Sequence, residues 1–203
     1  MPYKIKEIFY SIQGEGFHSG RPAVFIRFSG CNLWNGLESG RESAICKFCD
    51  TDFVGGETFQ DAESVADAAR FLVDFDDVLC ILTGGEPALQ IDSKLVSALK
   101  EVGFVVAVET NGTRPIPGNL DWVTVSPKAG TELMVRSGDE IKVVFPQDGI
   151  DLDRIAKMDF DHFYLQPMEG PNLEENIKGT VSYCMPHPSW SISIQSHKIL
   201  GLR

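Results

Sequence analysis

Hydrophobic positions along the chain follow two different spacings. Short apolar or β-branched runs are typical of strands, and the stretches between them have helical spacing. In the stretch 61–73, for example, Val65, Ala68, Ala69 and Leu72 fall on one helical face. Strands are predicted at 23–30, 78–87, 104–112, 122–128, 140–146, 163–168 and 190–197, and helical segments at 61–73, 92–103, 151–158 and 172–184.

The alternation of strands and helices predicts a parallel sheet with helices packed outside it. The helix at 92–103 has Asp92 or Ser93 as its N-cap and Gly103 near its end. Residues 31–60 form a long polar loop. A chain of 203 residues with such a loop is shorter than the roughly 250 residues of a full (β/α) barrel. We therefore expect one α/β domain over residues 1–203, built as a modified, incomplete TIM-type barrel.

Nearly every predicted strand ends in a polar tag. The tags read SGC, TGGEP, ETNG, SPK, QPM and QSHK. In barrels and open α/β sheets, ligand-binding residues collect at the carboxyl ends of the strands. The six tags therefore predict one shared site.

Charge narrows the class of ligand. The chain has 18 Lys and Arg against 29 Asp and Glu, a formal charge of −11, and no dense basic cluster. Nucleic-acid binders normally carry a basic face, so a small-molecule substrate is favoured. The N-terminal MPYKIKEIFY has no signal-peptide h-region, and no run approaches the roughly 18 apolar residues of a membrane helix. We expect a cytoplasmic protein that binds neither membrane nor nucleic acid.

The chain contains five cysteines. An odd number without a secretion signal argues against a disulfide framework. Cys80 lies in the apolar run VLCIL and Cys184 in VSYCMP, and both are expected to pack as small hydrophobic side chains. Cys31, Cys46 and Cys49 remain to be explained.

Fourteen residues separate Cys31 from Cys46, and two separate Cys46 from Cys49. Structural zinc would need a fourth ligand, and the nearest histidine, His18, lies well upstream. A thioredoxin-like pair would leave Cys31 without a role. Adventitious spacing is a third reading. The fourth is a [4Fe–4S] cluster with three thiolate ligands, which leaves one iron open to a ligand, whereas such clusters normally have four cysteines.

The residues around these cysteines resemble the radical SAM superfamily, through C-x14-C-x2-C-D-T (31–51), TGGEP (83–87), ETNG (109–112) and SPK (126–128). That superfamily usually carries C-x3-C-x2-C, so the insertion at 32–45 is a departure. More narrowly, the chain resembles the 7-carboxy-7-deazaguanine synthase family of queuosine and 7-deazapurine biosynthesis, some members of which have a comparably long loop. The further segments that carry this resemblance are FYSIQGEG (9–16), RPAVFIRFSGCNLW (21–34), FCDTDF (48–53), LQPMEGP (165–171) and QSHK (195–198).

The resemblance implies an incomplete barrel of the radical SAM kind, with the cluster-binding loop at 31–52. Cys31, Cys46 and Cys49 would hold the [4Fe–4S] cluster, whose open iron chelates S-adenosylmethionine (SAM). The protein's task is then binding, orientation and exclusion of side reactions. The SAM-binding residues would be Gly85 and Glu86 at the ammonium, Ser126, Pro127 and Lys128 at the ribose and carboxylate, and Gln166, Pro167, Met168 and Glu169 at the adenosine.

Simpler readings exist for these motifs. TGGEP would serve as a tight turn with a solvated Glu86, and the other tags as ordinary strand ends. Glu109, Asn111 and His197 are second-choice site residues, because turn chemistry or structural packing explains them equally well.

The family substrate is 6-carboxy-5,6,7,8-tetrahydropterin, which has a guanine-like hydrogen-bonding edge and a carboxylate. Arg27 would hold the carboxylate in a bidentate pair, or else point outward from a half-buried strand. A hydrogen atom would be abstracted from C6, and ring contraction with loss of ammonia would give 7-carboxy-7-deazaguanine, a carbon–nitrogen lyase reaction. The substrate-binding residues would be Ile12, Gln13, Gly14, Glu15, Arg27, Thr83 and the terminal carboxylate of Arg203.

In the same family a threonine that follows the last cysteine coordinates Mg²⁺ together with the substrate, which implies that role for Thr51. A homodimer and a flavodoxin- or ferredoxin-type electron donor are also implied.

Two other functions are weighed: a radical SAM activase that makes a glycyl radical on a partner protein, and a non-catalytic zinc-binding module. IQGEG and CDT favour the synthase.

Overall fold

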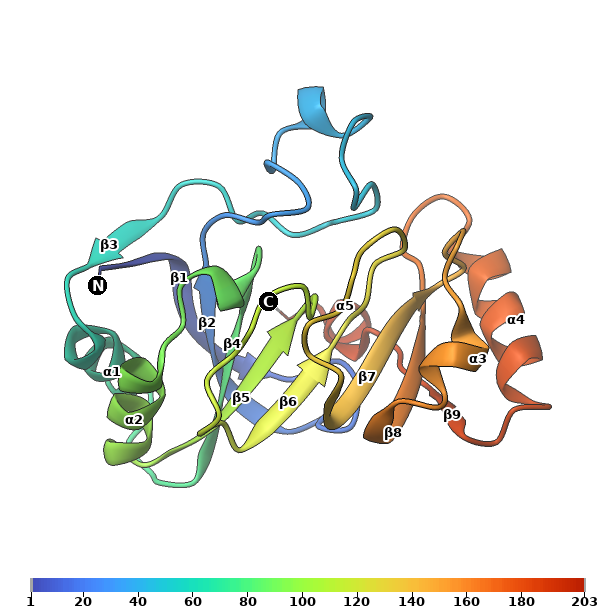
Figure 1. Cartoon of the computed structure of the whole chain (residues 1–203). Coiled ribbons are helices and arrows are strands. Elements are labelled where there is room, and N and C mark those ends of the chain that lie inside the picture. The colour runs from blue at the N-terminus through green and yellow to red at the C-terminus, as the bar shows by residue number, and fades with distance from the viewer. Residues whose placement is uncertain (1, 203) are drawn as a thin grey trace.

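The structure is a computed structural model that describes residues 2–202, and its sheet is open. Within these residues nine strands form a single sheet in the order β3-β1-β2-β4-β5-β6-β7-β8-β9 (Figure 1). All neighbouring pairs from β2 to β9 are parallel, whereas β1 is antiparallel to β2 and β3. Because β3 and β9 lie at opposite edges, the barrel is incomplete, as predicted. The strands are β1 (Tyr3–Ile12), β2 (Pro22–Phe28), β3 (Glu57–Phe59), β4 (Val78–Gly84), β5 (Phe104–Thr110), β6 (Trp122–Val125), β7 (Ser137–Phe145), β8 (Asp159–Pro167) and β9 (Trp190–Ile192).

Helices cover the outer face of the sheet at both ends, with α1 and α2 beside one group of strands and α3 and α4 beside the other (Figure 1). Aspartates cap three of them, as local chemistry favours; Asp92 accepts a hydrogen bond from the amide of Leu95, one of the two caps predicted there. Between residues 2 and 202 no helix is long and apolar enough to cross a membrane. The helices are α1 (Ala62–Arg70), α2 (Ser93–Glu101), α3 (Leu152–Ile155), α4 (Leu173–Cys184) and α5 (Ser196–Leu200), with 3₁₀ turns η1 (Glu38–Gly40) and η2 (Pro87–Leu89).

Strand β2 shows how the sheet separates an outer core from an inner one. Val24 and Ile26 pack outward into the core formed with α1 and α2. Phe25 points to the other face, where its ring stacks on Phe9 at 5.0 Å between centroids. Because side chains alternate along a strand, Arg27 shares the inner face with Phe25. The outward orientation considered for Arg27 is therefore wrong.

The strand β1 was not among the predicted strands, because its hydrophobic alternation is interrupted. Its pairing with β2 shifts register between Ile5 and Glu7. A bulge of this kind places two residues against one and breaks the period of two on which the prediction depends. The short β3 inside the predicted loop pairs with the start of β1, from Tyr3 to Ile5.

The predicted strand at 190–197 is correct only for its first part. Strand β9 ends at Ile192, although the amide of Ser193 still bonds to Leu165 O at 2.9 Å. The chain then turns into α5, where the amide of Ser196 bonds to Gly14 O at 2.9 Å. The QSHK tag thus enters a helix held by the loop after β1, a contact that local sequence does not encode.

The two aspartate caps of α1 and α2 give a matched test of this packing. Asp61 caps α1 alone, through the amide of Ser64, whereas Asp92 also accepts the hydroxyl of the buried Tyr3 at 2.8 Å. We expect Asp61→Ala to lower the free energy of unfolding by about 1 kcal/mol. Asp92→Ala should cost about 2–3 kcal/mol, since it also strands a buried hydroxyl. Equal losses for the two variants in urea denaturation would contradict this account.

Candidate functional site

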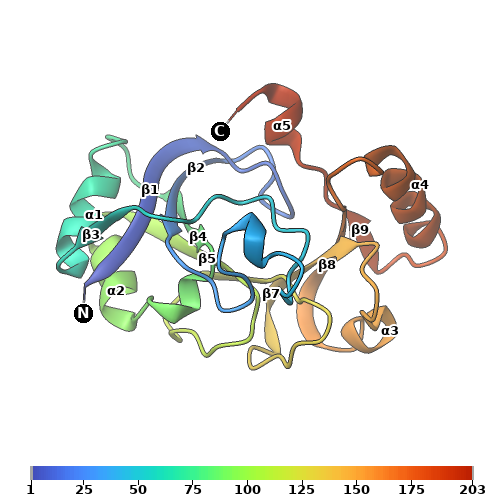
Figure 2. The ribbon, with the colours of Figure 1, turned by 90° about the horizontal axis from the view of Figure 1, so that it is seen from above.

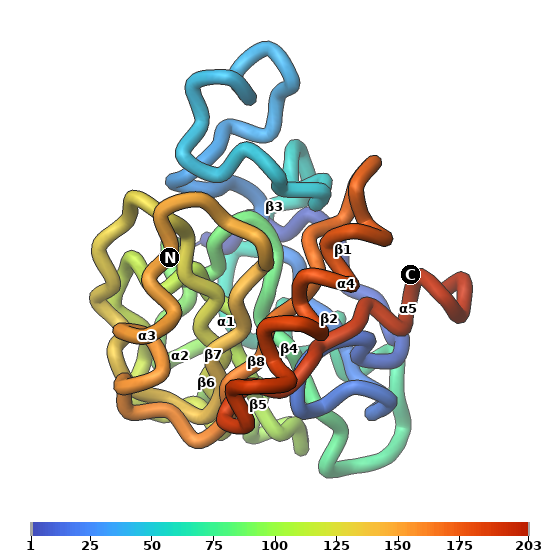
Figure 3. Tube along the Cα trace, turned by 90° about the vertical axis from the view of Figure 1, so that its right-hand side faces the viewer, coloured from blue at the N-terminus to red at the C-terminus, as the bar shows by residue number. Residues whose placement is uncertain are grey.

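A cavity of about 630 Å³ is lined by the carboxyl ends of the parallel strands and by the loop 31–52. This loop lies above the strand ends in Figure 1 and in front of the sheet in Figure 2, and it stands out from the sheet in the side view of Figure 3. All six strand-end tags contribute to the lining. Of the site residues expected from the sequence, those that line the cavity are Ile12, Gln13, Gly14, Glu15, Arg27, Cys31, Cys46, Cys49, Thr51, Thr83, Gly85, Ser126, Lys128, Gln166, Pro167, Met168 and Glu169.

Two expected site residues are not on the wall. Glu86 is fully buried behind it and Pro127 is also buried. Arg203 lies outside the described residues. The second-choice residues Glu109, Asn111 and His197, in contrast, all line the cavity.

The paired glycines of TGGEP are required where β4 passes the end of β2. Gly84 has a φ of +132°, and a Cβ atom there would lie 2.4 Å from the backbone of Phe28. A Cβ on Gly85 would lie 2.0 Å from Gly30 O. No other residue allows the two chain segments to approach so closely. This contact sets the end of β4 directly beside the residue that precedes Cys31.

Glu86 ties TGGEP to the end of β5. Its carboxylate accepts the hydroxyl of Thr110 at 2.5 Å, the amide of Asn111 at 2.7 Å and the amide of Ala88 at 2.9 Å. Burial raises the pKa of Glu86, and these hydrogen bonds oppose the rise. The reading of Glu86 as a solvated turn residue is wrong.

The three clustered cysteines are free thiols that line the same cavity. A hydrogen bond between Cys46 and Cys49 raises the pKa of Cys46 and lowers that of Cys49 to about 6. Burial raises the pKa of Cys31, whose sulfur accepts the amide of Leu33. The buried Cys80 packs in the outer core, as predicted.

This donor set suits a cluster. Among residues 2–202, no three His, Cys, Asp or Glu side chains converge as the ligands of a single metal ion would. A cluster makes a different demand, because each thiolate binds its own iron and the sulfurs surround a volume. Three thiols around one cavity meet that demand.

The insertion at 32–45 folds around Arg41. The Arg41 guanidinium lies 4.1 Å from the centroid of the Trp34 ring and donates to Lys47 O at 2.9 Å and Cys49 O at 3.1 Å. Trp34 in turn packs edge-on against Phe53 at 5.5 Å. Arg41 therefore connects the insertion to the backbone of the C-x-x-C pair. Sequence reasoning did not identify it.

Lys128 is a cation beside the thiols. Its ammonium donates to Ser126 O at 2.6 Å and Ser126 Oγ at 2.8 Å. Burial lowers the pKa of Lys128, and the nearby charges of Cys46, Glu86 and Cys49 oppose that change. An ammonium at this position favours the thiolate form of its neighbours.

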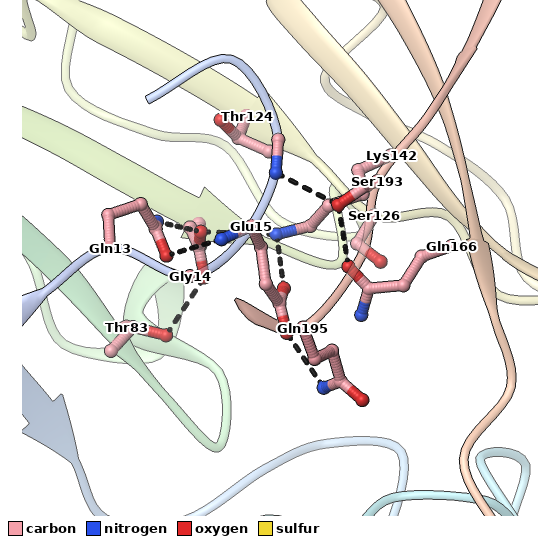
Figure 4. A network of polar contacts seen from close by, with 12 residues as sticks. Gln13, Gly14, Glu15, Thr83, Thr124, Ser126, Lys142, Gln166, Ser193 and Gln195 are labelled. Atoms are coloured by element: carbon pink, nitrogen blue, oxygen red, sulfur yellow. Dashed lines mark hydrogen bonds and ion pairs between the residues drawn. The ribbon is translucent and has the colours of Figure 1, made fainter. Parts of the chain in front are cut away.

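A network of polar and charged contacts forms part of the cavity wall (Figure 4). The buried Lys142 ammonium lies 2.6 Å from Glu15 Oε2 and 3.2 Å from Glu109 Oε1. Gln13 donates to Glu109 at 2.9 Å, and Gln195 donates to Glu15 at 2.8 Å. Lys142 was not among the expected residues. The available signal was a lysine inside the apolar run EIKVVF, at a buried position of β7.

Arg27 lines the cavity and is already paired with Glu7. Its Nε lies 2.8 Å from Glu7 Oε1, and its guanidinium lies 5.8 Å from the centroid of Phe9. Thr83 at the end of β4 is 3.5 Å from Glu109 Oε2. The predicted contacts of Arg27 and Thr83 with substrate stay predictions.

At the cavity edge, Lys198 of α5 joins two segments that are distant in sequence. Its ammonium lies 2.8 Å from Asp50 Oδ2 in the cysteine loop and 3.2 Å from Glu169 Oε2 after β8. All three residues line the cavity. The C-terminal helix is thus linked electrostatically to the loop that carries the cysteines.

Residues 41–158 match the model of the radical SAM superfamily. Together with an open parallel sheet whose carboxyl edge carries the three cysteines, this match makes the chain a radical SAM enzyme. It is 51% identical to 7-carboxy-7-deazaguanine synthase from Caulobacter vibrioides and 49% identical to the synthase from Bradyrhizobium diazoefficiens, in both cases over 100% of each chain. The chain belongs to the 7-carboxy-7-deazaguanine synthase family.

A solved structure agrees with this assignment. The crystal structure of QueE from Escherichia coli superposes with a TM-score of 0.76 at 26% sequence identity, covering 96% of this chain and 94% of that one. The resemblance stated from the motifs is confirmed, and so is the fold class.

Glu140, two residues before Lys142, predicts a pH dependence of stability. Burial raises the pKa of Glu140 from 4.5 to about 7, although the charge of Lys142 opposes the rise. The folded state therefore retains a proton that the unfolded state releases between about pH 4.5 and 7, so Glu140 lowers stability as pH rises through this window. Above pH 7 we expect Glu140→Gln to unfold at higher urea, with a gain of up to about 3 kcal/mol.

Below about pH 4.5 the difference between Glu140→Gln and the parent should vanish. Glu132→Gln is a suitable control, because this exposed glutamate has only a surface pair with Arg136, and it should change stability little. Parallel stability-against-pH curves for the parent and Glu140→Gln would contradict the prediction.

Proposed function

We propose that the chain is a 7-carboxy-7-deazaguanine synthase that converts 6-carboxy-5,6,7,8-tetrahydropterin into 7-carboxy-7-deazaguanine and ammonia, within queuosine biosynthesis. The observation that carries the proposal is the meeting, on one cavity, of three thiols and a carboxylate–amide network, in a chain that matches relatives of this name over its whole length. Substrate and product differ by one molecule of ammonia, so the reaction needs no net oxidant.

In this proposal Cys31, Cys46 and Cys49 hold a [4Fe–4S] cluster on which SAM binds. When bound, the cluster and SAM supply a 5′-deoxyadenosyl radical that takes the hydrogen atom from substrate C6. The chain's own work is binding and orientation. The Gly85 backbone, with the buried charge of Glu86 behind it, suits the SAM ammonium.

The remaining SAM contacts come from the ends of β6 and β8. Ser126 and Lys128 face the cavity and suit the SAM ribose and carboxylate, while the segment 166–169 suits the adenosine. Pro127 lies behind the wall, so we assign it the role of fixing the turn between Ser126 and Lys128.

The substrate then occupies the other side of the cavity. Gln13, Glu15 and the Gly14 backbone face its guanine-like edge, with Ile12 and Thr83 beside them, and Arg27 faces its carboxylate. A donor–acceptor pattern of this kind discriminates strongly, because a mismatched ligand leaves buried polar groups unpaired. The Arg203 carboxylate is a further proposed ligand.

Thr51 is proposed to bind Mg²⁺ together with the substrate carboxylate and waters. Hard oxygen ligands and partial hydration suit this ion. The ion would orient the carboxylate and balance charge as the ring rearranges.

We further propose one radical SAM domain over residues 1–203, a homodimer, a cytoplasmic location and a flavodoxin- or ferredoxin-type electron donor.

Metal analysis after oxygen-free purification tests the cluster. We expect about four irons and four sulfides per chain in the parent protein, the composition of a [4Fe–4S] cluster. Cys46→Ala should lose most of the iron, whereas Cys184→Ala keeps it, since Cys184 ends α4, packs against the core and does not line the cavity. One zinc and no iron in the parent would instead support a zinc-binding module.

Turnover tests the specific reaction. Reconstituted protein with SAM, a reductant and carboxytetrahydropterin should form a deazaguanine product, faster with Mg²⁺ than without it. Thr51→Val should reduce the Mg²⁺ stimulation several-fold while SAM binding is retained, because only the hydroxyl ligand is removed. A fully loaded protein that yields no deazaguanine would overturn the assignment.

A further inference from the structure

Lys142 is a charged side chain inside an otherwise apolar strand. Its neighbours Ile141 and Val143 on β7 are fully buried in the core beneath α3 and α4, and Lys142 itself is 5% exposed. Placing an ammonium in such a position is costly unless it is paired and hydrogen-bonded. Its hydrogen-bond partners among the described residues are Glu15 and Glu109, which approach it from the loop after β1 and from β5.

The pairing controls the charge of Glu15. Burial alone would raise the pKa of Glu15, but the charge and hydrogen bond of Lys142, with the Gln195 amide and His197, lower it to about 2. The three carboxylates Glu109, Glu15 and Glu140 together raise the pKa of Lys142 despite its burial. Glu15 is therefore ionised throughout the neutral range, and the Lys142 ammonium makes the largest contribution to this.

Both glutamates keep acceptor capacity toward the cavity. A carboxylate offers about four lone-pair positions. Glu15 uses two of them, for Lys142 and Gln195, while Glu109 uses three, for Lys142, Gln13 and Thr83. Their side chains are 16% and 24% exposed, and both line the cavity. The unused positions suit a ligand edge that presents adjacent N–H donors.

We propose that Lys142 is a positioning residue that holds Glu15 and Glu109 together as a pair of charged acceptors, and that this pair makes the site prefer a 2-amino-4-oxo pteridine over its 2-oxo analogue. The assignment rests on the proposed function and deepens it. The 2-amino group and the adjacent ring N–H supply the two donors, whereas a 2-oxo group would place an acceptor against a carboxylate. Without Lys142, the two carboxylates lose the cation that allows them to lie together, and one of them takes up a proton.

Binding of two stable probes tests this role without turnover. Pterin-6-carboxylate carries the 2-amino group, and lumazine-6-carboxylate has an oxygen in its place. We expect the parent protein to prefer the pterin by at least about tenfold, the effect of one mismatched polar contact. Lys142→Met should weaken pterin binding about tenfold or more and reduce the preference to below about threefold, since the acceptor charge is lost.

Lys100→Met is the matched control. Lys100 also lies 2.7 Å from a carboxylate, that of Asp121, but the pair is half-exposed and remote from the cavity. This variant should bind both probes as the parent does. Loss of the preference in Lys100→Met would show that the effect of Lys142→Met is not specific, and would overturn the proposal.

The pH profile separates positioning from simple structural damage. The charged and titratable groups that face this network are Glu15, Glu109, Glu140, Lys128, His18 and His197. In the parent, the contribution of Glu15 to pterin binding should be constant from pH 6 to 8. In Lys142→Met, affinity for the pterin should rise as pH increases through this range, because the released carboxyl must first ionise. A profile identical to that of the parent would contradict the proposal.

Two further variants complete the test, and the first of them, Lys142→Arg, decides the case if Lys142→Met does not fold. Lys142→Arg retains the charge and should keep the pterin preference even at reduced affinity; its loss in a folded protein would refute the role. In the double variant Glu15→Gln/Lys142→Met both charges are removed together. Its loss of pterin affinity should be smaller than the sum of the losses in the two single variants, and a loss equal to that sum would contradict coupling. A parent protein that binds neither probe counts against the proposed function, whereas a parent that prefers the pterin beside an unchanged Lys142→Met counts against this inference alone.

Discussion

Parallel pairing of the strands from β2 to β9 is the constraint on which the site depends. Parallel strands all end at one edge, so residues far apart in sequence meet there. TGGEP at the end of β4 reaches ETNG at the end of β5 through the Glu86 carboxylate, and the close approach of Gly85 to Gly30 brings the start of the cysteine loop to the same place. The position of the cavity is therefore a consequence of topology.

Two lysines, the buried Lys142 and the half-buried Lys128, give different parts of this cavity a different character. Lys128 lies close enough to Cys46 and Glu86 for their charges to affect its pKa. Lys142 instead binds Glu15 and Glu109, so its charge is more than balanced. Burial strengthens both effects, because charges interact more strongly where water is excluded. One region thus suits thiolates and an anionic group, and the other suits a ligand with hydrogen-bond donors.

Two parts of the cavity wall, the cysteine loop and α5, do not belong to the sheet. They are held in place by contacts between residues that are far apart in sequence. Arg41 fixes the insertion to the C-x-x-C backbone, and Lys198 connects α5 to Asp50 across 148 positions of sequence. The hydrogen bonds of Ser196 to Gly14 O place α5 against the loop after β1. The cysteine loop and the C-terminal helix consequently form adjacent parts of one wall, although neither belongs to the sheet.

The sequence by itself determined the fold class, the alternating strands and helices, the cap at Asp92 and the six tags that line the cavity, because these follow from local periodicity, capping chemistry and motif order. It missed β1, where a bulge interrupts the hydrophobic alternation, and α5, which depends on contacts with Gly14. Only the tertiary structure decided that Glu86 lies behind the wall and that Lys142 joins Glu15 to Glu109. Such pairings depend on which strand ends become neighbours in the sheet, and local sequence patterns do not predict that order.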